Sequence, residues 1–299
     1  MAANEYAVRS IAEGFHFLEG PRWHNGQLYF SDFADGKVYV LQSNGRVEVV
    51  CRAPHWVSGL GFAPGGELLV VAVQERKLLR CGGLAGLVEV ADLNGVARYH
   101  CNDMLVDEHG RAYIGNFGFD MDCDPICTTE LAVVSSTGEV AVAATDLVFP
   151  NGMARTADGR TLIVAETFAA RLTAFDILED GSLTGRRTWA ALSDRSFATV
   201  TECLGSGAPL PDGIALDTEG ALWIADAGGR AALRVAPGGE ILDRVPTPGL
   251  TVFAVALGGS DLRTLYICAS PPLYSHDPSV EKKAVLLAAR VDVPGIQTV

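Results

Sequence analysis

The sequence lacks the features that mark nucleic-acid-binding, membrane-spanning and exported proteins. Basic residues are few, since 23 Lys and Arg face 36 Asp and Glu and leave a net charge of −13, and no basic cluster stands out. Such a chain repels a phosphate backbone or an anionic membrane. No apolar run reaches the roughly 18 residues of a membrane span, and no basic stretch followed by an apolar run opens the chain. We therefore expect a cytoplasmic protein without nucleic-acid, membrane or evident protein partners.

The sequence also lacks the patterns of a disulfide framework, of a complete zinc site and of a serine hydrolase. The seven cysteines are odd in number and scattered, which predicts reduced thiols. Cys123 and Cys127 are spaced like half of a zinc site, but no second pair of Cys or His follows at ligand spacing. The Gly-x-Ser-x-Gly elbow of serine hydrolases is absent, so a nucleophilic serine is not expected.

Glycine, by contrast, is abundant, with 33 residues, and much of it falls in a pattern that recurs six times. Each copy has a small or polar residue, an apolar stretch, a turn and a second apolar run. Two apolar runs around such a turn predict a β-hairpin. The copies are EGPRWHNGQLYFSD (19–32), SGLGFAPGGELLVVAV (58–73), NDMLVDEHGRAYIGNF (102–117), NGMARTADGRTLIVAET (151–167), DGIALDTEGALWIADA (212–227) and FAVALGGSDLRTLYICA (253–269).

The spacing of the copies predicts an all-β fold, a six-bladed β-propeller of four-stranded antiparallel blades. The copies begin 39, 44, 49, 61 and 41 residues apart, which is the length of propeller blades with insertions in the third and fourth steps. Further strand material after each hairpin supplies the outer strands. We expect one domain over residues 1–299, closed by residues 5–15 and the run AVLLAARVDV (284–293). A linear solenoid is the alternative.

The first residues of the copies are predicted to surround the propeller axis, because equivalent positions of the inner strands do so. They are Glu19, Ser58, Asn102, Asn151, Asp212 and Phe253. Asn and Asp before Gly are ordinary turn residues, but a buried Glu19 needs a partner charge or a metal. An all-oxygen ligand set suits one divalent ion such as Ca²⁺, Mg²⁺, Mn²⁺ or Fe²⁺, with Zn²⁺ as a further alternative. His100 and Asp103, beside Asn102, are candidates for orienting a polar substrate.

Four segments carry a resemblance to a known family. FLEGPRWHNGQLYFSD, HCND, FPNGMARTADGRTLIVAET and LPDGIALDTEGALWIADA resemble, in order, the hallmark segments of the senescence-marker, gluconolactonase and luciferin-regenerating-enzyme family. The resemblance implies a six-bladed propeller with one divalent cation held by Glu19, Asn151 and Asp212, and a substrate contact from Asn102. In animal gluconolactonases an arginine two residues before that asparagine contacts the sugar lactone. His100 stands there in this chain, so the resemblance leaves the sugar specificity open.

The expected activity is hydrolysis of a small lactone by metal-activated water, with Asp212 as the general base. The segment GNFGFDMDCDPICTT (115–129) is expected to form a loop over one mouth of the channel, where Asp120 or Asp122 is a candidate for contacting the substrate, although exposed loop acids are usually solvated. Two alternatives remain open. The first is a metal-dependent propeller enzyme of another reaction type, such as ester or phosphotriester hydrolysis, isomerisation or cyclisation. The second is a ligand-binding propeller without enzymatic activity.

Overall fold

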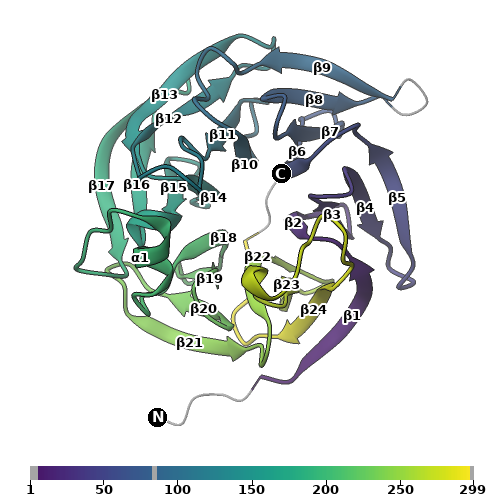
Figure 1. The fold of residues 1–299 in the computed structure, drawn as a ribbon. Helices are drawn as coiled ribbons and strands as arrows, with labels where there is room; N and C mark the ends of the chain where they lie inside the picture. Colours follow the sequence, from purple (N-terminus) through teal and green to yellow (C-terminus); the bar gives the residue numbers. More distant parts are fainter. Residues whose placement is uncertain (1–5, 83–85, 297–299) are drawn as a thin grey trace.

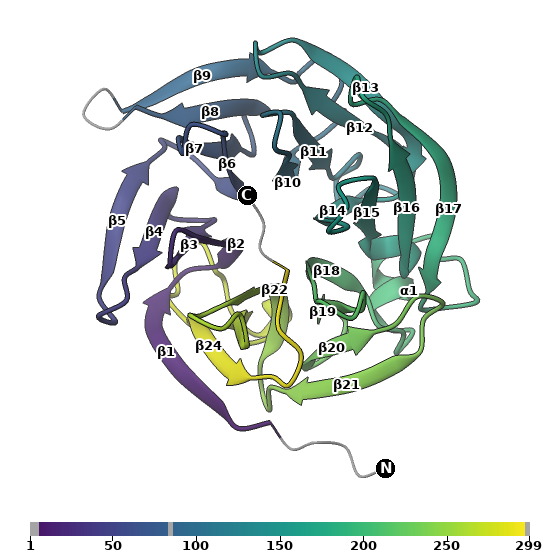
Figure 2. The same ribbon diagram turned by 180° about the vertical axis from the view of Figure 1, so that it is seen from behind.

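Six four-stranded antiparallel sheets surround a common axis in the computed structural model, which describes residues 6–82 and 86–296 (Figures 1 and 2). In five sheets the strands follow the chain order from the axis outwards. The predicted six-bladed β-propeller is therefore confirmed. No helix among these residues is long and apolar enough to cross a membrane.

The predicted hairpins form the two inner strands of each blade. Blade one contains β2 (Leu18–His24), β3 (Gln27–Asp32), β4 (Lys37–Leu41) and β5 (Val47–Arg52), and blade two contains β6 (Val57–Phe62), β7 (Leu68–Ala72), β8 (Lys77–Cys81) and β9 (Leu87–Asp92). Blade three contains β10 (Cys101–Val106), β11 (Ala112–Asn116), β12 (Thr129–Val134) and β13 (Val140–Leu147), and blade four contains β14 (Pro150–Arg155), β15 (Thr161–Glu166), β16 (Arg171–Ile177) and β17 (Leu183–Ala191). Blade five contains β18 (Pro211–Leu216), β19 (Leu222–Asp226), β20 (Ala231–Val235) and β21 (Ile241–Pro246), and blade six contains β22 (Thr251–Gly258), β23 (Thr264–Ser270), β24 (Ala284–Arg290) and β1 (Val8–Phe15).

The ring is closed by strands from the two ends of the chain. Strand β1 pairs antiparallel with β24, from Val8 opposite Ala289 to Phe15 opposite Ala284. The N-terminal strand is thus the outermost strand of the blade that the C-terminal strands build, as predicted. Because this pairing joins the first and last strands, opening the ring requires breaking the hydrogen bonds between them.

The apolar core lies between neighbouring blades. Strands β7 (LLVVA), β19 (LWIAD) and β20 (AALRV) are buried at every residue, because adjacent blades cover both faces of each sheet. Between blades three and four, for example, Tyr113 packs with Leu162 in one cluster. The outer strand β17 instead exposes most of its residues. Each blade therefore depends on its neighbours to cover its apolar faces.

All six inner strands begin at the same end of the axis, which we call the start face. The second strand of each blade ends there, so the connections between second and third strands also lie on this face. Two long connections, 117–128 and 192–210, account for the predicted insertions, and the second carries the short helix α1 (Val200–Leu204). A third long connection, 271–283, carries η3 (Leu273–Ser275). The hairpin turns between first and second strands lie on the opposite face, the end face.

Neighbouring inner strands approach each other closely, and glycine makes this approach feasible. A Cβ atom on Gly152 of β14 would lie 2.5 Å from the backbone oxygen of Asp212 on β18. A Cβ atom on Gly20 of β2 would lie 2.6 Å from the backbone oxygen of Ser58 on β6, and Gly20 has a φ of +54°. These glycines let the inner strands, and the side chains beside the glycines, draw together around the axis.

We predict that Gly152→Ala separates β14 from β18, because the added methyl group meets backbone atoms that cannot rotate away. The free energy of unfolding should fall by about 1–3 kcal/mol, as measured by urea denaturation. Gly95→Ala is the matched control, since its methyl group would meet no atom within 4 Å and its φ is not positive. That variant should stay within about 0.5 kcal/mol of the parent. Equal stability of the two variants would contradict the close approach.

Candidate active site

Six residues, one near the beginning of each inner strand, occupy equivalent positions around the axis close to the start face. They are Glu19, Ser58, Asn102, Asn151, Asp212 and Phe253, which we call the ring residues. Asn151 illustrates how the backbone positions them. Pro150 pairs with Glu166 and Met153 pairs with Val164, so Asn151 and Gly152 together face one residue of β15. Such a β-bulge changes the direction of a side chain relative to the sheet.

The three predicted ligands are buried and close together. Glu19, Asn151 and Asp212 expose only 6%, 4% and 6% of their surface. The Asn151 Nδ2 donates to the Thr167 Oγ1 at 3.2 Å, and that hydroxyl donates to the Pro211 carbonyl at 2.8 Å. These bonds join β14 to the residue just before Asp212. The side chain of Asn151 also interacts with the Asp212 carboxylate and lowers its pKa.

Three carboxylates from non-adjacent blades act on one another at the axis. Burial is the largest cause that raises the pKa of Glu19 well above its ordinary value, and the charges of Asp212 and Asp103 raise it further. The pKa of Asp212 is also raised well above its ordinary value, first by burial and then by Asp103. The Gly20 N–H and the Arg22 guanidinium oppose the rise at Glu19. Without a cation, the ring therefore favours protonated carboxyl groups.

Several buried polar atoms of the ring have no hydrogen-bond partner within residues 6–82 and 86–296. They are the Asp212 Oδ1, the Asn102 Nδ2 and the Ser58 Oγ. An unpaired buried polar atom costs about 1–3 kcal/mol, so these atoms indicate a ligand. A divalent cation fits the carboxylates, because it would coordinate the free Asp212 oxygen and offset the repulsion with Glu19. In the described residues no cluster of three or more His, Cys, Asp or Glu forms a metal centre. A site here therefore depends on an amide oxygen as the third ligand.

The other predicted residues of the Asn102 strand have different surroundings. The Asp103 Oδ1 accepts from the Arg22 Nη2 at 2.7 Å and from the Met104 N–H at 2.8 Å. Asp103 is thus held in an ion pair with a side chain of blade one. His100 is half-buried, and burial lowers its pKa, which favours the neutral imidazole.

Asp120 lies in the 117–128 connection, within the segment that was predicted to cover one mouth. Its carboxylate accepts from the Tyr99 hydroxyl at 3.1 Å and from the Asp122 N–H at 3.0 Å. These bonds hold the loop in shape. The connection is tied to 192–210 by the Ile126 N–H, which donates to the Ala198 carbonyl at 3.0 Å. A substrate contact from Asp120 stays a prediction.

Three acidic residues that sequence reasoning missed support the strands of the predicted ligands. They are the last residues of the second strands in blades one, four and five, namely Asp32, Glu166 and Asp226. Asp32 accepts from the Phe17 N–H at 2.9 Å, Glu166 from the Val148 N–H at 2.7 Å and Asp226 from the Leu210 N–H at 3.0 Å. The donors precede Glu19, Asn151 and Asp212 by two or three residues. The other second strands end in Ala72, Asn116 and Ser270, so acidic ends coincide with the three candidate ligands. The hairpin endings FSD, AET and IAD were the available signal.

Aromatic side chains line the start face beside the ring in a continuous series, which we call the aromatic arc. Each contacts the next with ring centroids 4.6–5.8 Å apart. The arc consists, in order, of Phe253, Phe17, Phe33, Trp56, His100, Phe117 and Phe149. All except Phe253 lie just before an inner strand or just after a second strand, which places them on the start face.

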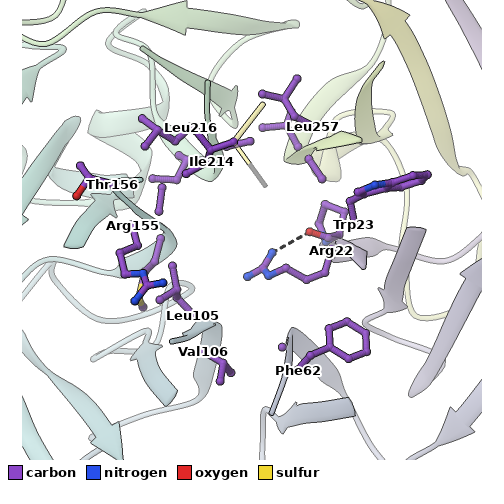
Figure 3. A pocket seen from close by; sticks show the side chains of 18 of the residues that line it. Arg22, Trp23, Phe62, Leu105, Val106, Arg155, Thr156, Ile214, Leu216 and Leu257 are labelled. Atoms are coloured by element: carbon purple, nitrogen blue, oxygen red, sulfur yellow. Dashed lines mark hydrogen bonds between the residues drawn. The ribbon is translucent and has the colours of Figure 1, made fainter. Parts of the chain in front are cut away.

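The end face has a separate cavity of about 150 Å³ (Figure 3). Arg22, Trp23, Phe62, Arg155 and Leu257 are among the residues that line it, and the ring residues are not. Arg22 pairs with Asp103 and Arg155 pairs with Glu108. Because both cations already have carboxylate partners, this cavity offers no free charge for chemistry.

The comparisons with known proteins identify the family of the chain. The family model described as SMP-30/Gluconolactonase/LRE-like region matches residues 17–270, a span that includes all six ring residues. The chain belongs to this family. The resemblance predicted from the four sequence segments is thereby confirmed.

Individual relatives and solved structures match nearly the whole chain. A 6-deoxy-6-sulfogluconolactonase of Pseudomonas putida is 29% identical over 270 residues, which are 90% of this chain and 88% of the relative. A luciferin-regenerating enzyme has a solved structure with a TM-score of 0.81 at 21% identity, covering 98% of each chain. A calcium-binding protein, regucalcin, of Agrobacterium tumefaciens has a TM-score of 0.80 at 20% identity and covers 100% of this chain and 98% of its own. Both structures share the propeller fold.

We predict that Glu19 and Asp212 destabilise the chelated protein increasingly as the pH rises, because their folded-state pKa values are raised. The unfolded chain releases these protons near pH 4, whereas the folded chain keeps them to higher pH. The contribution of these two groups to stability is therefore fully present below about pH 4 and is lost as the pH rises through their folded-state pKa values.

The measurement is the free energy of unfolding from pH 4 upwards in excess chelator, for the parent and for Asp212→Asn. The variant lacks one buried charge that repels Glu19 and Asp103, so its free energy of unfolding should decline less as the pH rises. Comparing the two proteins cancels the titration of all other groups. Parallel pH profiles would show that the ring carboxylates do not control stability.

Proposed function

We propose that the chain is a metal-dependent lactonase, which opens a small lactone by hydrolysis with one divalent cation on Glu19, Asn151 and Asp212. The main support is the unpaired, buried Asp212 Oδ1 beside a second carboxylate at the axis. The names of relatives give the reaction class, since one is called a 6-deoxy-6-sulfogluconolactonase. An all-oxygen set suits Ca²⁺, Mg²⁺ or Mn²⁺, and a solved relative is described as calcium-binding.

A bound divalent cation supplies Lewis-acid polarisation of the lactone carbonyl and lowers the pKa of nearby water. Side chains of the protein carry out the proton transfers and stabilise the developing negative charge. The Asp212 carboxylate has lone pairs beyond the one that would bind the cation, so it can also accept the proton of the attacking water. The Asn102 Nδ2 is a free donor, suited to the oxygen on which negative charge develops. As the water oxygen bonds to the carbonyl carbon, the ring C–O bond breaks, and Asp212 returns its proton to the leaving alkoxide. The product is a hydroxy acid.

The first test joins metal analysis of the purified protein to a panel of lactones, assayed with and without chelator. We expect about one equivalent of a divalent metal and hydrolysis that chelator abolishes and metal restores. Hydrolysis that is insensitive to complete metal removal would overturn the proposal.

We predict that Asp212→Asn lowers kcat by about 100-fold or more at saturating metal, because an amide keeps the shape and an oxygen ligand but cannot accept the proton. Metal occupancy should fall less than activity. Asp212→Ala should lower both, since it also removes the oxygen ligand. Near-parental turnover of metal-loaded Asp212→Asn would move the base elsewhere.

We predict that Asp226→Ala weakens divalent-cation affinity about tenfold or more, the usual effect of losing a group that orients a ligand. The Asp226 Oδ1 accepts from the Leu210 and Gly228 N–H groups at 3.0 and 3.1 Å, and its loss frees the segment that leads into Asp212. Asp226→Asn keeps an oxygen acceptor and should bind the cation better than Asp226→Ala.

The matched control for this prediction is Ser270→Ala, at the equivalent position of blade six, which holds no proposed ligand. Calorimetric titration of each metal-free protein with Ca²⁺ or Mn²⁺ measures the affinity directly. An equal change in Asp226→Ala and Ser270→Ala would show that the acidic strand ends have no positioning role.

A further inference from the structure

The aromatic arc differs along its length in how much ring surface it leaves open. Phe117 and Phe149 expose 7% and 5% of their surface, because they pack with the residues of the 117–128 and 192–210 connections. Phe33, Trp56 and His100, over blades one to three, are only half-buried. These three side chains therefore leave part of their aromatic surface accessible instead of packing all of it into the core.

This open part of the arc lies beside the polar ring. His100 is two residues before Asn102, whose Nδ2 is buried without an acceptor in the described chain. The aromatic surface and an unused hydrogen-bond donor thus come from one short segment that enters β10. A molecule that bonds to this donor through a carbonyl oxygen therefore binds next to the segment that carries His100, whose ring contacts Trp56.

The cation beside the ring carboxylates is directed away from this surface, and the charges that act on His100 are those of Arg76, Asp120 and Glu75. Arg22, the cation that lowers the pKa of Glu19, donates to Asp103 and to the Met104 carbonyl and lines the cavity of the end face (Figure 3). The imidazole of His100 contacts the rings of Trp56, Tyr99 and Phe117. The Tyr99 hydroxyl already donates to Asp120.

A polyhydroxylated lactone is a poor match for such a surface, because each hydroxyl group that it buries needs a hydrogen-bond partner. A flat apolar group is a good match, since aromatic rings pack favourably edge-to-face or offset. We propose that the substrate is a lactone with a fused or attached aromatic ring, which packs against Phe33, Trp56 and His100 while its carbonyl lies at the ring residues. This inference rests on the proposed lactonase function and specifies its substrate class.

The test compares three six-membered lactones that share an alkoxide leaving group: isochroman-3-one with a fused benzene ring, unsubstituted δ-valerolactone and glucono-δ-lactone. Each kcat/KM is divided by the rate of hydroxide-catalysed hydrolysis of the same lactone. The metal-loaded protein should prefer isochroman-3-one by about tenfold or more over each of the others. An equal or higher corrected value for glucono-δ-lactone would overturn the inference.

Variants locate the preference. Trp56→Ala should lower kcat/KM for isochroman-3-one about tenfold, mainly through KM, and change δ-valerolactone less than about twofold. Trp56→Phe should retain most of the preference for isochroman-3-one. Phe33→Leu, like Trp56→Ala, should lower kcat/KM for this substrate. Phe62→Ala is the control, because Phe62 is a half-buried aromatic residue in the cavity of the end face, and it should change neither substrate.

The outcomes separate the two proposals. If none of the three lactones is hydrolysed with Ca²⁺, Mg²⁺ or Mn²⁺ present, the lactonase function fails. If lactones are hydrolysed but Trp56→Ala and Phe33→Leu leave the preference among them unchanged, the function stands and the aromatic substrate class fails.

Discussion

The repulsion between buried carboxylates at the axis is the constraint on which the rest of the structure depends. Glu19 and Asp212 come from blades one and five, and Asp103 adds a third charge from blade three. Charges buried so close together are costly unless a cation or a proton offsets them. The propeller supplies the opposing stability elsewhere, through apolar packing between all blades and the closing pair of β1 and β24. A site that is unfavourable by itself is thus built into a ring that is difficult to open.

The supports of the ring are specific to individual blades. Arg22 forms an ion pair with Asp103, and the side chain of Asn151 interacts with the Asp212 carboxylate and lowers its pKa. Asp32, Glu166 and Asp226 each accept a hydrogen bond from the backbone segment that leads to Glu19, Asn151 or Asp212. The second strands of the other three blades do not end in an acidic residue. These carboxylates satisfy N–H groups that would otherwise be unpaired inside the protein. The same fold repeat therefore carries a precise site in some blades and plain apolar packing in others.

The sequence was sufficient for the fold and for the ring residues, because both follow from a repeat with a fixed period. A buried glutamate such as Glu19 is informative by itself, since burial of a lone carboxylate needs an explanation. The Asp103 ion pair was not predictable, because its partner Arg22 lies 81 positions earlier in the chain. Asp226, at the end of an apolar strand, resembles an ordinary turn residue. The residues of the aromatic arc are single aromatics next to different strands, and only the closed ring places them side by side.

The two faces of the propeller have opposite characters, and the inner strands connect them. On the start face lie carboxylates, free polar atoms and open aromatic surface, whereas on the end face Arg22 and Arg155 are neutralised by acidic partners. The C-terminal segment also packs on the end face, where the Thr218 N–H donates to the Pro294 carbonyl at 2.9 Å and Ile296 lines the cavity. Leaving a buried polar group without a hydrogen-bond partner costs free energy, and a ligand that bonds to the group offsets that cost. Three unpaired buried atoms of the described chain, the Asp212 Oδ1, the Asn102 Nδ2 and the Ser58 Oγ, belong to the ring, which argues that binding and chemistry occur on the start face, whereas the end face holds Arg22 beneath the ring.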